Sequence, residues 1–394
     1  MRELPLFLLL VGINLLILIG QIQGLSIGYH EAKILYGEFS PLQQIITLSL
    51  HLFGQNDYAL RAPMIVLHLF SVFLLYAISK FYVSGKNDRI WIVLIYMLLP
   101  GVTSAALIVD NAGLMIALVF LFAYGYLRFG RYALALFPLY IGIDPAFAYL
   151  FFATAIYGLY RKEWWYGFVG GASFIVSLYV YGIHVGGLPE SRFLDAFGIY
   201  AAIFSPIVFL YLFYVLYRRM IAKQWDLIWM IAMSAFVISI LLSFRQKVEV
   251  QTFAPYLMLA LPMAGETFLH TYRIRLREFR GKYRLLFYSA FILLIINASV
   301  VFFNQWFYRF LKDPTRHFSY SMHIVKELAG ALKENHIYCV DANDKKLQLR
   351  LRFYGVTQCE MYHLTKKRNP KALKVTISYK NTPIFHAYVT KINK

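Results

Sequence analysis

Three titratable side chains stand where the chain leaves long apolar runs. His30 and Glu31 follow the first run, and Asp110 follows the third. Ionisable groups close to bilayer depth are energetically costly, so a cluster of them is a candidate functional site. Carboxylates and an imidazole, whose pKa is about 6.5 when unperturbed, are suited to general acid–base catalysis. These residues therefore predict proton-transfer chemistry in a cavity on which several helix ends converge.

The acidic residues also have structural interpretations. Asp110 and Asp144, which directly precedes Pro145, are candidate helix N-caps. Glu31 is alternatively a solvated charge in the first turn of a surface helix. Glu31 and Asp110 would bind a divalent cation if they converge, but the sequence has no metal-site motif, and we expect neither a metal nor another cofactor.

Two cations, Arg245 and Lys247, lie on a loop between late apolar runs, and Tyr256 follows shortly after. Cations are scarce in the loops that are predicted below to lie outside the membrane, and this loop is one of them. Arg245 and Lys247 therefore indicate an anionic partner such as a phosphate. Arg61, just before the second apolar run, is a candidate helper. The alternative is a general attraction to lipid head groups without a defined site.

The elements that must position these residues are transmembrane helices. The 394-residue chain is 60% hydrophobic and 15% charged, whereas a typical soluble domain is about 25% charged. Its net charge of +19 is spread between apolar runs rather than gathered on one soluble face, which argues against nucleic acid as a partner. About eleven runs are candidate spans, with 131–143 the weakest because it is short: 5–23, 62–79, 90–109, 112–127, 131–143, 146–160, 166–183, 198–217, 227–243, 253–272 and 285–304.

The loops predict the orientation of these spans. With the N-terminus inside, the cytoplasmic segments hold 17 Lys and Arg residues, and the opposite loops hold five: Lys33, Arg61, Arg192, Arg245 and Lys247. The positive-inside rule therefore predicts a cytoplasmic N-terminus in the inner membrane, and an odd number of spans places the C-terminal tail outside. The first run is too long for a cleaved signal peptide and is expected to remain as helix one.

Two polar regions outside the spans carry secondary-structure signals. In the first outer segment, 24–61, Ser40 and Pro41 begin a helix that Gly54 ends. Its apolar face would lie on the membrane surface and consists of Leu42, Ile45, Ile46, Leu50 and Phe53. The tail predicts helices at 322–334 and around 344–352, with strands at 337–340, 356–362, 373–379 and 383–389. We therefore expect a membrane domain, 1–304, and a small α/β extracytoplasmic domain, 305–394.

The two cysteines of the chain, Cys339 and Cys359, both lie in this tail. On neighbouring strand candidates in an oxidising compartment they are candidates for a disulfide, with buried free thiols as the alternative. Neither residue is placed to act within the bilayer.

Short motifs follow one another along residues 1–270: His30-Glu31-Ala32, Phe39–Leu42, Leu52–Gly54 with Ala59–Pro63, Val109–Leu114, Ile143–Pro145 and Arg245–Pro262. Leu351–Gly355 adds a motif in the tail. In this order they resemble the GT-C superfamily of polytopic glycosyltransferases, in the branch that contains protein O-mannosyltransferases and the lipid A aminoarabinose transferase. Two positions depart from that pattern. His30 stands where the family has an Asp, the implied general base, and Phe39 replaces a His.

The resemblance implies a GT-C-like α-helical polytopic fold and a sugar donor linked to polyprenyl phosphate. An acidic base would deprotonate a hydroxyl of an envelope lipid, glycan or protein, which attacks the anomeric carbon with inversion while cations stabilise the departing phosphate. Glu31 is the first candidate for the base, Asp110 orients or shares the proton, and His30 replaces the missing Asp. The candidate donor-binding residues are Arg245, Lys247, Arg61, Tyr256 and Asp144.

Two other functions remain open. A non-catalytic member of the same fold would bind a polyprenyl lipid or organise an envelope assembly, and the missing Asp would be its signature. A lipid transporter would show repeated halves or Gly/Pro-broken helices at matching positions, and the sequence shows neither.

Overall fold

The structure is a computed structural model of the chain, and it describes residues 3–37, 39–182, 192–311, 313–367, 370, 372–379 and 382–391. Arg2, which enters the charge count above, lies outside the described residues, as does the last residue of the run 166–183. The chain divides into two compact units. Unit 1 comprises Met1–Asn14, Val66–Ala105 and Asn111–Ala298, and unit 2 comprises Leu15–Ile65, Ala106–Asp110 and Ser299–Lys394.

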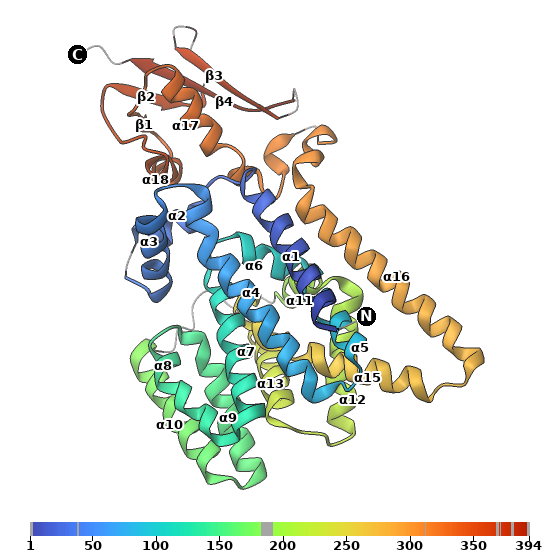
Figure 1. Cartoon of the computed structure of the whole chain (residues 1–394). Helices are drawn as coiled ribbons and strands as arrows, with labels where there is room; N and C mark the ends of the chain where they lie inside the picture. Colours follow the sequence, from blue (N-terminus) through green and yellow to red (C-terminus); the bar gives the residue numbers. More distant parts are fainter. Residues whose placement is uncertain are drawn as a thin grey trace. The chain divides into compact units, whose positions relative to one another are not determined.

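The described residues are mostly helical, with one small sheet near the C-terminus (Figure 1). The α-helices are α1 (Glu3–Ile22), α2 (Tyr29–Tyr36), α3 (Pro41–Phe53), α4 (Asp57–Tyr82), α5 (Lys86–Leu98), α6 (Pro100–Leu107), α7 (Asn111–Phe129), α8 (Phe137–Ile141), α9 (Ala148–Arg161), α10 (Trp164–Tyr181), α11 (Phe193–Phe204), α12 (Pro206–Ile221), α13 (Leu227–Ser243), α14 (Val250–Leu257), α15 (Ala260–Ile274), α16 (Arg277–Phe302), α17 (Val325–Glu334) and α18 (Lys345–Phe353). The 3-10 helices and strands are η1 (Gly130–Leu136), η2 (Pro145–Phe147), η3 (Asn304–Arg309), η4 (Pro314–Arg316), η5 (Tyr320–Met322), β1 (Asp341–Ala342), β2 (Tyr362–Thr365), β3 (Leu373–Tyr379) and β4 (Thr382–Lys391).

Several described helices are long and apolar enough to cross a membrane. Four pass by length and composition, namely α1, α4, the stretch Asn111–Ile141 and α16. The count rises to six if each of two bent pairs is one span, α5 with α6 at 63° and α11 with α12 at 105°. Pro100 and Pro206 begin the second helix of each pair, because proline lacks the N–H that a continuous helix needs. The chain is therefore a membrane protein, and the count of eleven spans stays a prediction.

The short run 131–143 does not form one helix. It consists of η1 and the five-residue helix α8. Gly130, with φ +60°, ends the regular geometry of α7, and Pro138 sits in the first turn of α8. The left-handed glycine and the proline together account for the break.

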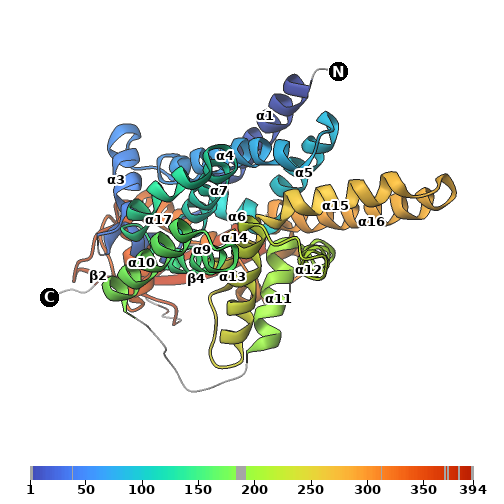
Figure 2. The ribbon, with the colours of Figure 1, turned by 90° about the horizontal axis from the view of Figure 1, so that it is seen from below.

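Unit 1 is a packed helical bundle with an aromatic core. α9 and α10 lie side by side (Figure 2), and a Cβ added at Gly158 would clash with the backbone of Gly167 on the facing helix. Glycine is therefore required for this close approach. Elsewhere in the bundle, the ring of Tyr200 stacks on Phe209, and its hydroxyl bonds Ser239, so α11, α12 and α13 are joined.

One end of unit 1 gathers charged residues from α1, α5, α12 and α15 and from Asp226, the N-cap of α13. The start of α1 contacts the start of α5, and the start of α5 contacts the end of α15. The last turn of α12 also contacts α15. The pairs are Glu3–Arg89 at 3.5 Å, Asp88–Arg273, Arg219–Glu266, Arg219–Asp226 at 3.4 Å and Arg218–Thr271 at 3.2 Å. The basic members all belong to segments predicted to be cytoplasmic. Their meeting at one end agrees with that prediction, while the orientation in the membrane stays a prediction.

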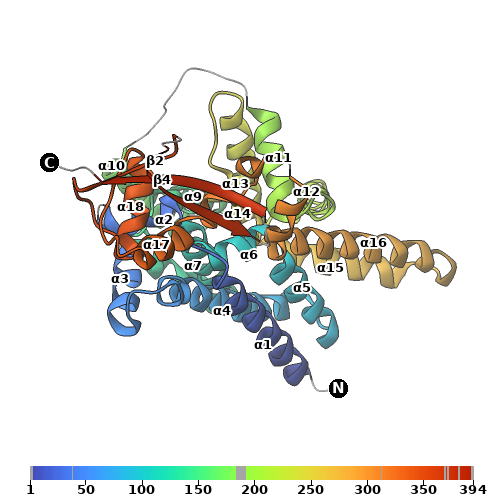
Figure 3. The same ribbon diagram turned by 90° about the horizontal axis from the view of Figure 1, so that it is seen from above.

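The C-terminal part of unit 2 is a four-stranded sheet in the order β1-β2-β4-β3 with α17 and α18 packed next to it (Figure 3). β1 pairs with β2 in parallel, and the other pairs are antiparallel. Val375 and Ile377 on β3 are buried at alternate positions, as are Phe385, Ala387 and Val389 on β4. The predicted strands 373–379 and 383–389 and both predicted helices are thus found with small shifts.

Two predicted strands are displaced. Instead of strands at 337–340 and 356–362, a single bridge joins Cys339 to Thr357, and the ladder begins later, at β1 and β2. The reason is long-range: β2 starts where Tyr362 finds its antiparallel partner Lys391 on β4. Cys339 and Cys359 form a disulfide beside this bridge, so of the two alternatives that the sequence left open the cysteines are paired and not free thiols.

Candidate active site

The first outer segment folds into two short helices, both within unit 2. Ser40 caps α3 by accepting from the N–H of Gln43, Pro41 takes the first position, and Gly54, with φ +81°, ends the helix, all as predicted. Leu42 and Ile46 are buried, whereas Ile45 and Phe53 are exposed. The apolar face predicted from the sequence is thus divided between the protein interior and the surroundings, and it leaves an exposed apolar side suited to a membrane surface.

Glu31 is enclosed at the start of α2. Its side chain is fully buried, and Oε2 accepts from the N–H of Gly28 at 2.6 Å, while Oε1 accepts from the N–H of Val109 at 2.9 Å. Arg61 on α4, also fully buried, places Nη2 3.3 Å from Oε2. Glu31 is therefore not the solvated first-turn charge that was one alternative. It is an anion surrounded by donors, and it holds the segment before Asp110 against α2.

The guanidinium of Arg61 binds several groups, all of them within unit 2. Nε donates to the carbonyl of Leu107 at 2.9 Å, and Nη2 donates to the carbonyl of Ser26 at 3.0 Å. Nη1 lies 3.5 Å from Oδ1 of Asp57, one helical turn earlier. A buried charge requires such compensation, because an unpaired ion in a low-dielectric interior costs several kcal/mol. Arg61 thus ties three chain segments together and has no exposed surface.

The C-terminal part joins the same network through Asp57. Lys326 on α17 pairs with Oδ2 of Asp57 at 2.9 Å, and the hydroxyl of Tyr354 donates to Oδ1 at 2.7 Å. The same hydroxyl accepts from the N–H of Ile27 at 2.9 Å. Burial and the nearby Asp57 carboxylate raise the pKa of Tyr354 well above its usual range, so this phenol stays a proton donor. The network of Glu31, Arg61, Asp57 and Lys326 is neutral overall.

His30 and Asp110 form the accessible pair beside this network. Nε2 of His30 lies 3.4 Å from Oδ1 of Asp110, with side chains 64% and 27% exposed. Glu31 and Val109, their immediate neighbours in sequence, are hydrogen-bonded to each other. His30, Glu31 and Asp110 thus lie close together in unit 2, while their predicted roles in catalysis stay predictions. An imidazole next to a carboxylate can accept and pass on a proton from a ligand hydroxyl.

Asp144 and Tyr256 meet at the start of η2 in unit 1. Oδ1 of Asp144 accepts from the N–H of Ala146 at 2.8 Å, the N-cap bond that was its structural alternative, and Oδ2 accepts from Asn111 at 2.8 Å. The hydroxyl of Tyr256, which is fully buried, donates to the carbonyl of Ala146 at 2.8 Å. These contacts join α7, η2 and α14, so both side chains stabilise the packing of the bundle.

Arg245 and Lys247 follow α13 in unit 1, and both are exposed. Among the described residues neither has an ion pair with a carboxylate. Exposed cations without such a partner are suited to an external anion. A sugar transfer from a lipid phosphate would require these cations to line one outward-facing cavity with Glu31 and Asp110, and this convergence stays a prediction.

The sequence analysis did not identify three residues of this network, namely Asp57, Tyr354 and Lys326. Asp57 and Arg61 are spaced for an i, i+4 ion pair, which is a readable signal. Tyr354 lies within the motif Leu351–Gly355, although its partner was not identified. Lys326 carries no signal in sequence, because its partner Asp57 is distant along the chain.

A scan against protein-family models and a search of curated proteins found no match. Among solved structures, ArnT from Cupriavidus metallidurans bound to undecaprenyl phosphate is similar with a TM-score of 0.57 and 10% identity, and the match covers 97% of each chain. The apo state of ArnT from the same organism gives a TM-score of 0.54 and 11% identity, again over 97% of each chain. At this identity the likeness is one of fold. The resemblance drawn from the sequence is thus confirmed at that level, and the chain has the GT-C-like fold of ArnT.

Proposed function

We propose that the chain is a membrane glycosyltransferase that moves a sugar from a polyprenyl-phosphate donor to an envelope lipid, glycan or protein. The observation that carries the proposal is the solvent-accessible His30–Asp110 pair, which lies next to the buried Glu31–Arg61 pair in a chain with a GT-C-like fold. ArnT of the same fold has been seen with undecaprenyl phosphate, which supports a polyprenyl-linked donor here.

In this proposal Asp110 accepts the proton of the acceptor hydroxyl, directly or through His30. The hydroxyl oxygen forms a bond to the anomeric carbon as the bond to the donor phosphate breaks, with inversion. Asp110 is favoured over Glu31 because the Glu31 carboxylate is enclosed by Gly28, Arg61 and Val109. Glu31 then acts as a positioning residue that fixes the segment 107–110.

The departing polyprenyl phosphate carries negative charge that cations must stabilise. Arg245 and Lys247 are the proposed ligands because they are exposed and directly follow the apolar helix α13. Arg61 is better suited to positioning, since its donors already bind the carbonyls of Ser26 and Leu107. We further propose that the site faces the outside of the inner membrane, together with the C-terminal domain.

The test uses the purified full chain with a labelled polyprenyl-phosphate sugar and an envelope extract. Transfer of the label with release of polyprenyl phosphate is expected for the wild type and not for Asp110→Asn. Donor binding is measured separately on both proteins. Binding without release above background in the wild type would overturn the transferase proposal.

That outcome would favour the second candidate, a non-catalytic protein that binds a polyprenyl lipid. Its supporting observation is the burial of Glu31, which removes one carboxylate from direct contact with a substrate. In that case Asp110→Asn would leave donor binding unchanged, and no variant would alter product formation.

A further inference from the structure

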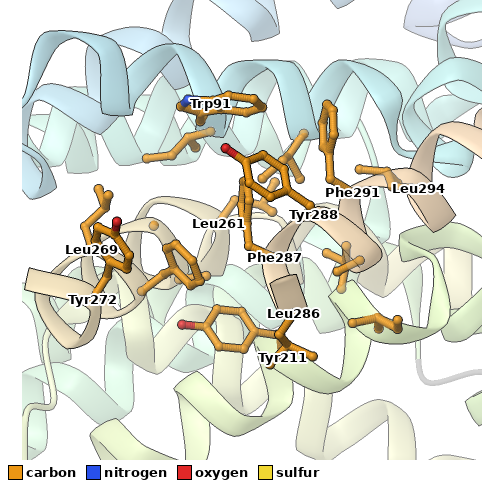
Figure 4. A pocket seen from close by; sticks show the side chains of 18 of the residues that line it. Trp91, Tyr211, Leu261, Leu269, Tyr272, Leu286, Phe287, Tyr288, Phe291 and Leu294 are labelled. Carbon is orange, nitrogen blue, oxygen red and sulfur yellow. The ribbon is translucent and has the colours of Figure 1, made fainter. Parts of the chain in front are cut away.

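A cavity of about 360 Å³ lies within unit 1, between α5, α12, α15 and α16 (Figure 4). Its wall is largely aromatic and aliphatic. The ring of Trp91 on α5 meets Phe287 and Phe291 of α16 edge-on, with centroids 5.5 and 5.3 Å apart, and Phe268 of α15 packs on Phe287 at 5.0 Å. The lining suits a hydrocarbon chain rather than a polar ligand.

The cavity has one polar end. Asp88, Tyr272 and Arg284 line it near the turn between α15 and α16, whereas Leu261 and Leu294 line the other end. From Arg284 to Leu294 the axis of α16 extends about 15 Å at 1.5 Å per residue. The cavity is therefore elongated and amphipathic, with polar groups gathered where a chain would enter.

The turn itself is strongly basic. Residues 273–284 contain six cations and one carboxylate, Glu278. Arg273 pairs with Asp88, and Arg280 donates to the carbonyls of Arg273 and Arg275. Among the described residues Arg284 has no ion pair with a carboxylate, although it lines the cavity. The turn therefore has unneutralised positive charge at the polar end.

Apolar side chains interleave with these cations. Ile274 is 67% exposed, Leu276 71% and Phe279 53%. Large exposed apolar groups among Arg and Lys are typical of a segment at the membrane–water boundary. The turn thus indicates where the head groups of one leaflet lie.

We propose that the cavity binds an acyl chain of an anionic glycerophospholipid, whose phosphate is held by Arg284 and the cations of the turn 273–284. Charge selects the ligand, because phosphate binds clustered guanidinium groups strongly and a zwitterionic lipid carries no net charge to match them. The site is independent of the proposed transferase activity.

This lipid is distinct from the proposed donor. Asp226, which caps the start of α13, pairs with Arg219 at the same charged end of unit 1 as the turn. Arg245 and Lys247 follow the opposite end of α13, about 25 Å along its axis. A donor phosphate at Arg245 and Lys247 would therefore lie at the far end of the bundle.

Trp91 provides a direct readout. The full chain is placed in phosphatidylcholine vesicles that contain a small fraction of lipid brominated on its acyl chains, and bromine quenches nearby indole fluorescence. The signal of Trp91 is the difference between the wild type and Trp91→Phe. Brominated phosphatidylglycerol is expected to quench it at a fraction about tenfold lower than brominated phosphatidylcholine, since a charge-assisted contact is worth at least that factor.

Arg284→Ala should raise the required phosphatidylglycerol fraction about tenfold, and its matched control, Arg161→Ala, which removes an exposed cation at the end of α9 outside the cavity lining, should change it much less. Equal effects of the two variants would indicate general surface electrostatics and overturn the proposal. Equal quenching by both brominated lipids in the wild type would do the same without any cavity variant. Unlabelled lipid can be added to compete with the brominated lipid. If undecaprenyl phosphate relieves the quenching of Trp91 and unlabelled phosphatidylglycerol does not, the cavity binds a polyprenyl lipid instead.

Discussion

Nε2 of His30 lies 3.4 Å from Oδ1 of Asp110, while the adjacent Glu31 is fully buried against Arg61. Two neighbouring residues of α2 thus have different tasks: His30 faces outward to a carboxylate, and Glu31 faces inward to a guanidinium. The difference follows from helix geometry, in which consecutive side chains point in directions about 100° apart.

The His30–Asp110 pair should determine the rate of the chemical step. Asp110→Asn is expected to lower the rate of polyprenyl phosphate release by about 10²–10⁴-fold, the usual contribution of a general base. Donor affinity should change little. The control is His51→Gln, an exposed side chain on α3. Normal turnover in Asp110→Asn would transfer the role of the base to His30 or Glu31.

The buried pair should determine stability. Glu31→Gln and Arg61→Met each remove one member of an ion pair, which costs about 3–5 kcal/mol when the partner is left buried. Arg61→Met should cost more, because it leaves both Glu31 and Asp57 without the guanidinium. The double variant should be more stable than the sum of the single effects predicts. Thermal unfolding in detergent measures this, with Lys33→Gln as the exposed control, and strict additivity would show that the pair is not coupled.

The exposed cations after α13 should affect the donor. Arg245→Ala and Lys247→Ala are each expected to weaken binding of the polyprenyl-phosphate donor by about tenfold, since each would remove a charge-assisted contact to phosphate. Arg161→Ala, at the end of α9, removes an exposed cation elsewhere in unit 1 and is the matched control. A similar loss of donor affinity in the control would show that the cations attract anionic lipid in general and do not form a specific donor site.

His323 should make the C-terminal domain sensitive to acid. Burial, with a smaller effect of His317, lowers the pKa of His323 to about 4. Its Nδ1 bonds the hydroxyl of Tyr308 at 2.8 Å, and its buried Nε2 has no hydrogen-bond partner among the described residues. In the unfolded chain the imidazole titrates near its usual pKa, so between about pH 6.5 and 4 the unfolded state binds more protons.

Stability is therefore fully present above about pH 6.5 and falls as the pH drops toward 4, by at most about 3 kcal/mol from this group. His323→Gln should flatten the dependence of unfolding temperature on pH between 7 and 5 by comparison with the wild type. His386→Gln, an exposed histidine on β4, should leave the slope unchanged. An unaltered slope in His323→Gln would show that other groups cause the acid sensitivity.

Topology can be measured directly. A reporter fused after Lys394 should be active if it functions only outside the cytoplasm, because the charge asymmetry of the loops predicts an inside N-terminus and an odd number of spans. A second fusion in the turn 273–284 should give the opposite result. Activity of a cytoplasmic reporter after Lys394 would reverse the placement of the C-terminal domain.

Local signals were enough for several elements. Ser40, Pro41 and Gly54 set the bounds of α3 because a cap, a first-turn proline and a left-handed glycine act within a few residues. The strand-like residue pattern likewise predicted β3 at its observed bounds, Leu373–Tyr379. Composition and loop charge identified a membrane protein, and the order of short motifs led to the GT-C-like fold.

Other features depend on contacts between distant residues. From the sequence Glu31 is first a candidate base, with a solvated charge and a cation ligand as alternatives, and only the structure shows that Arg61 and the N–H of Val109 enclose it. The start of β2 depends on its partner β4, and the role of Asp57 depends on Lys326 and Tyr354, which are far from it in the sequence. Side-chain types and spacing set which interactions a residue can make. Only the packed chain decides which one it makes, because burial removes water as the competing partner and leaves each charge to the groups that the fold brings beside it.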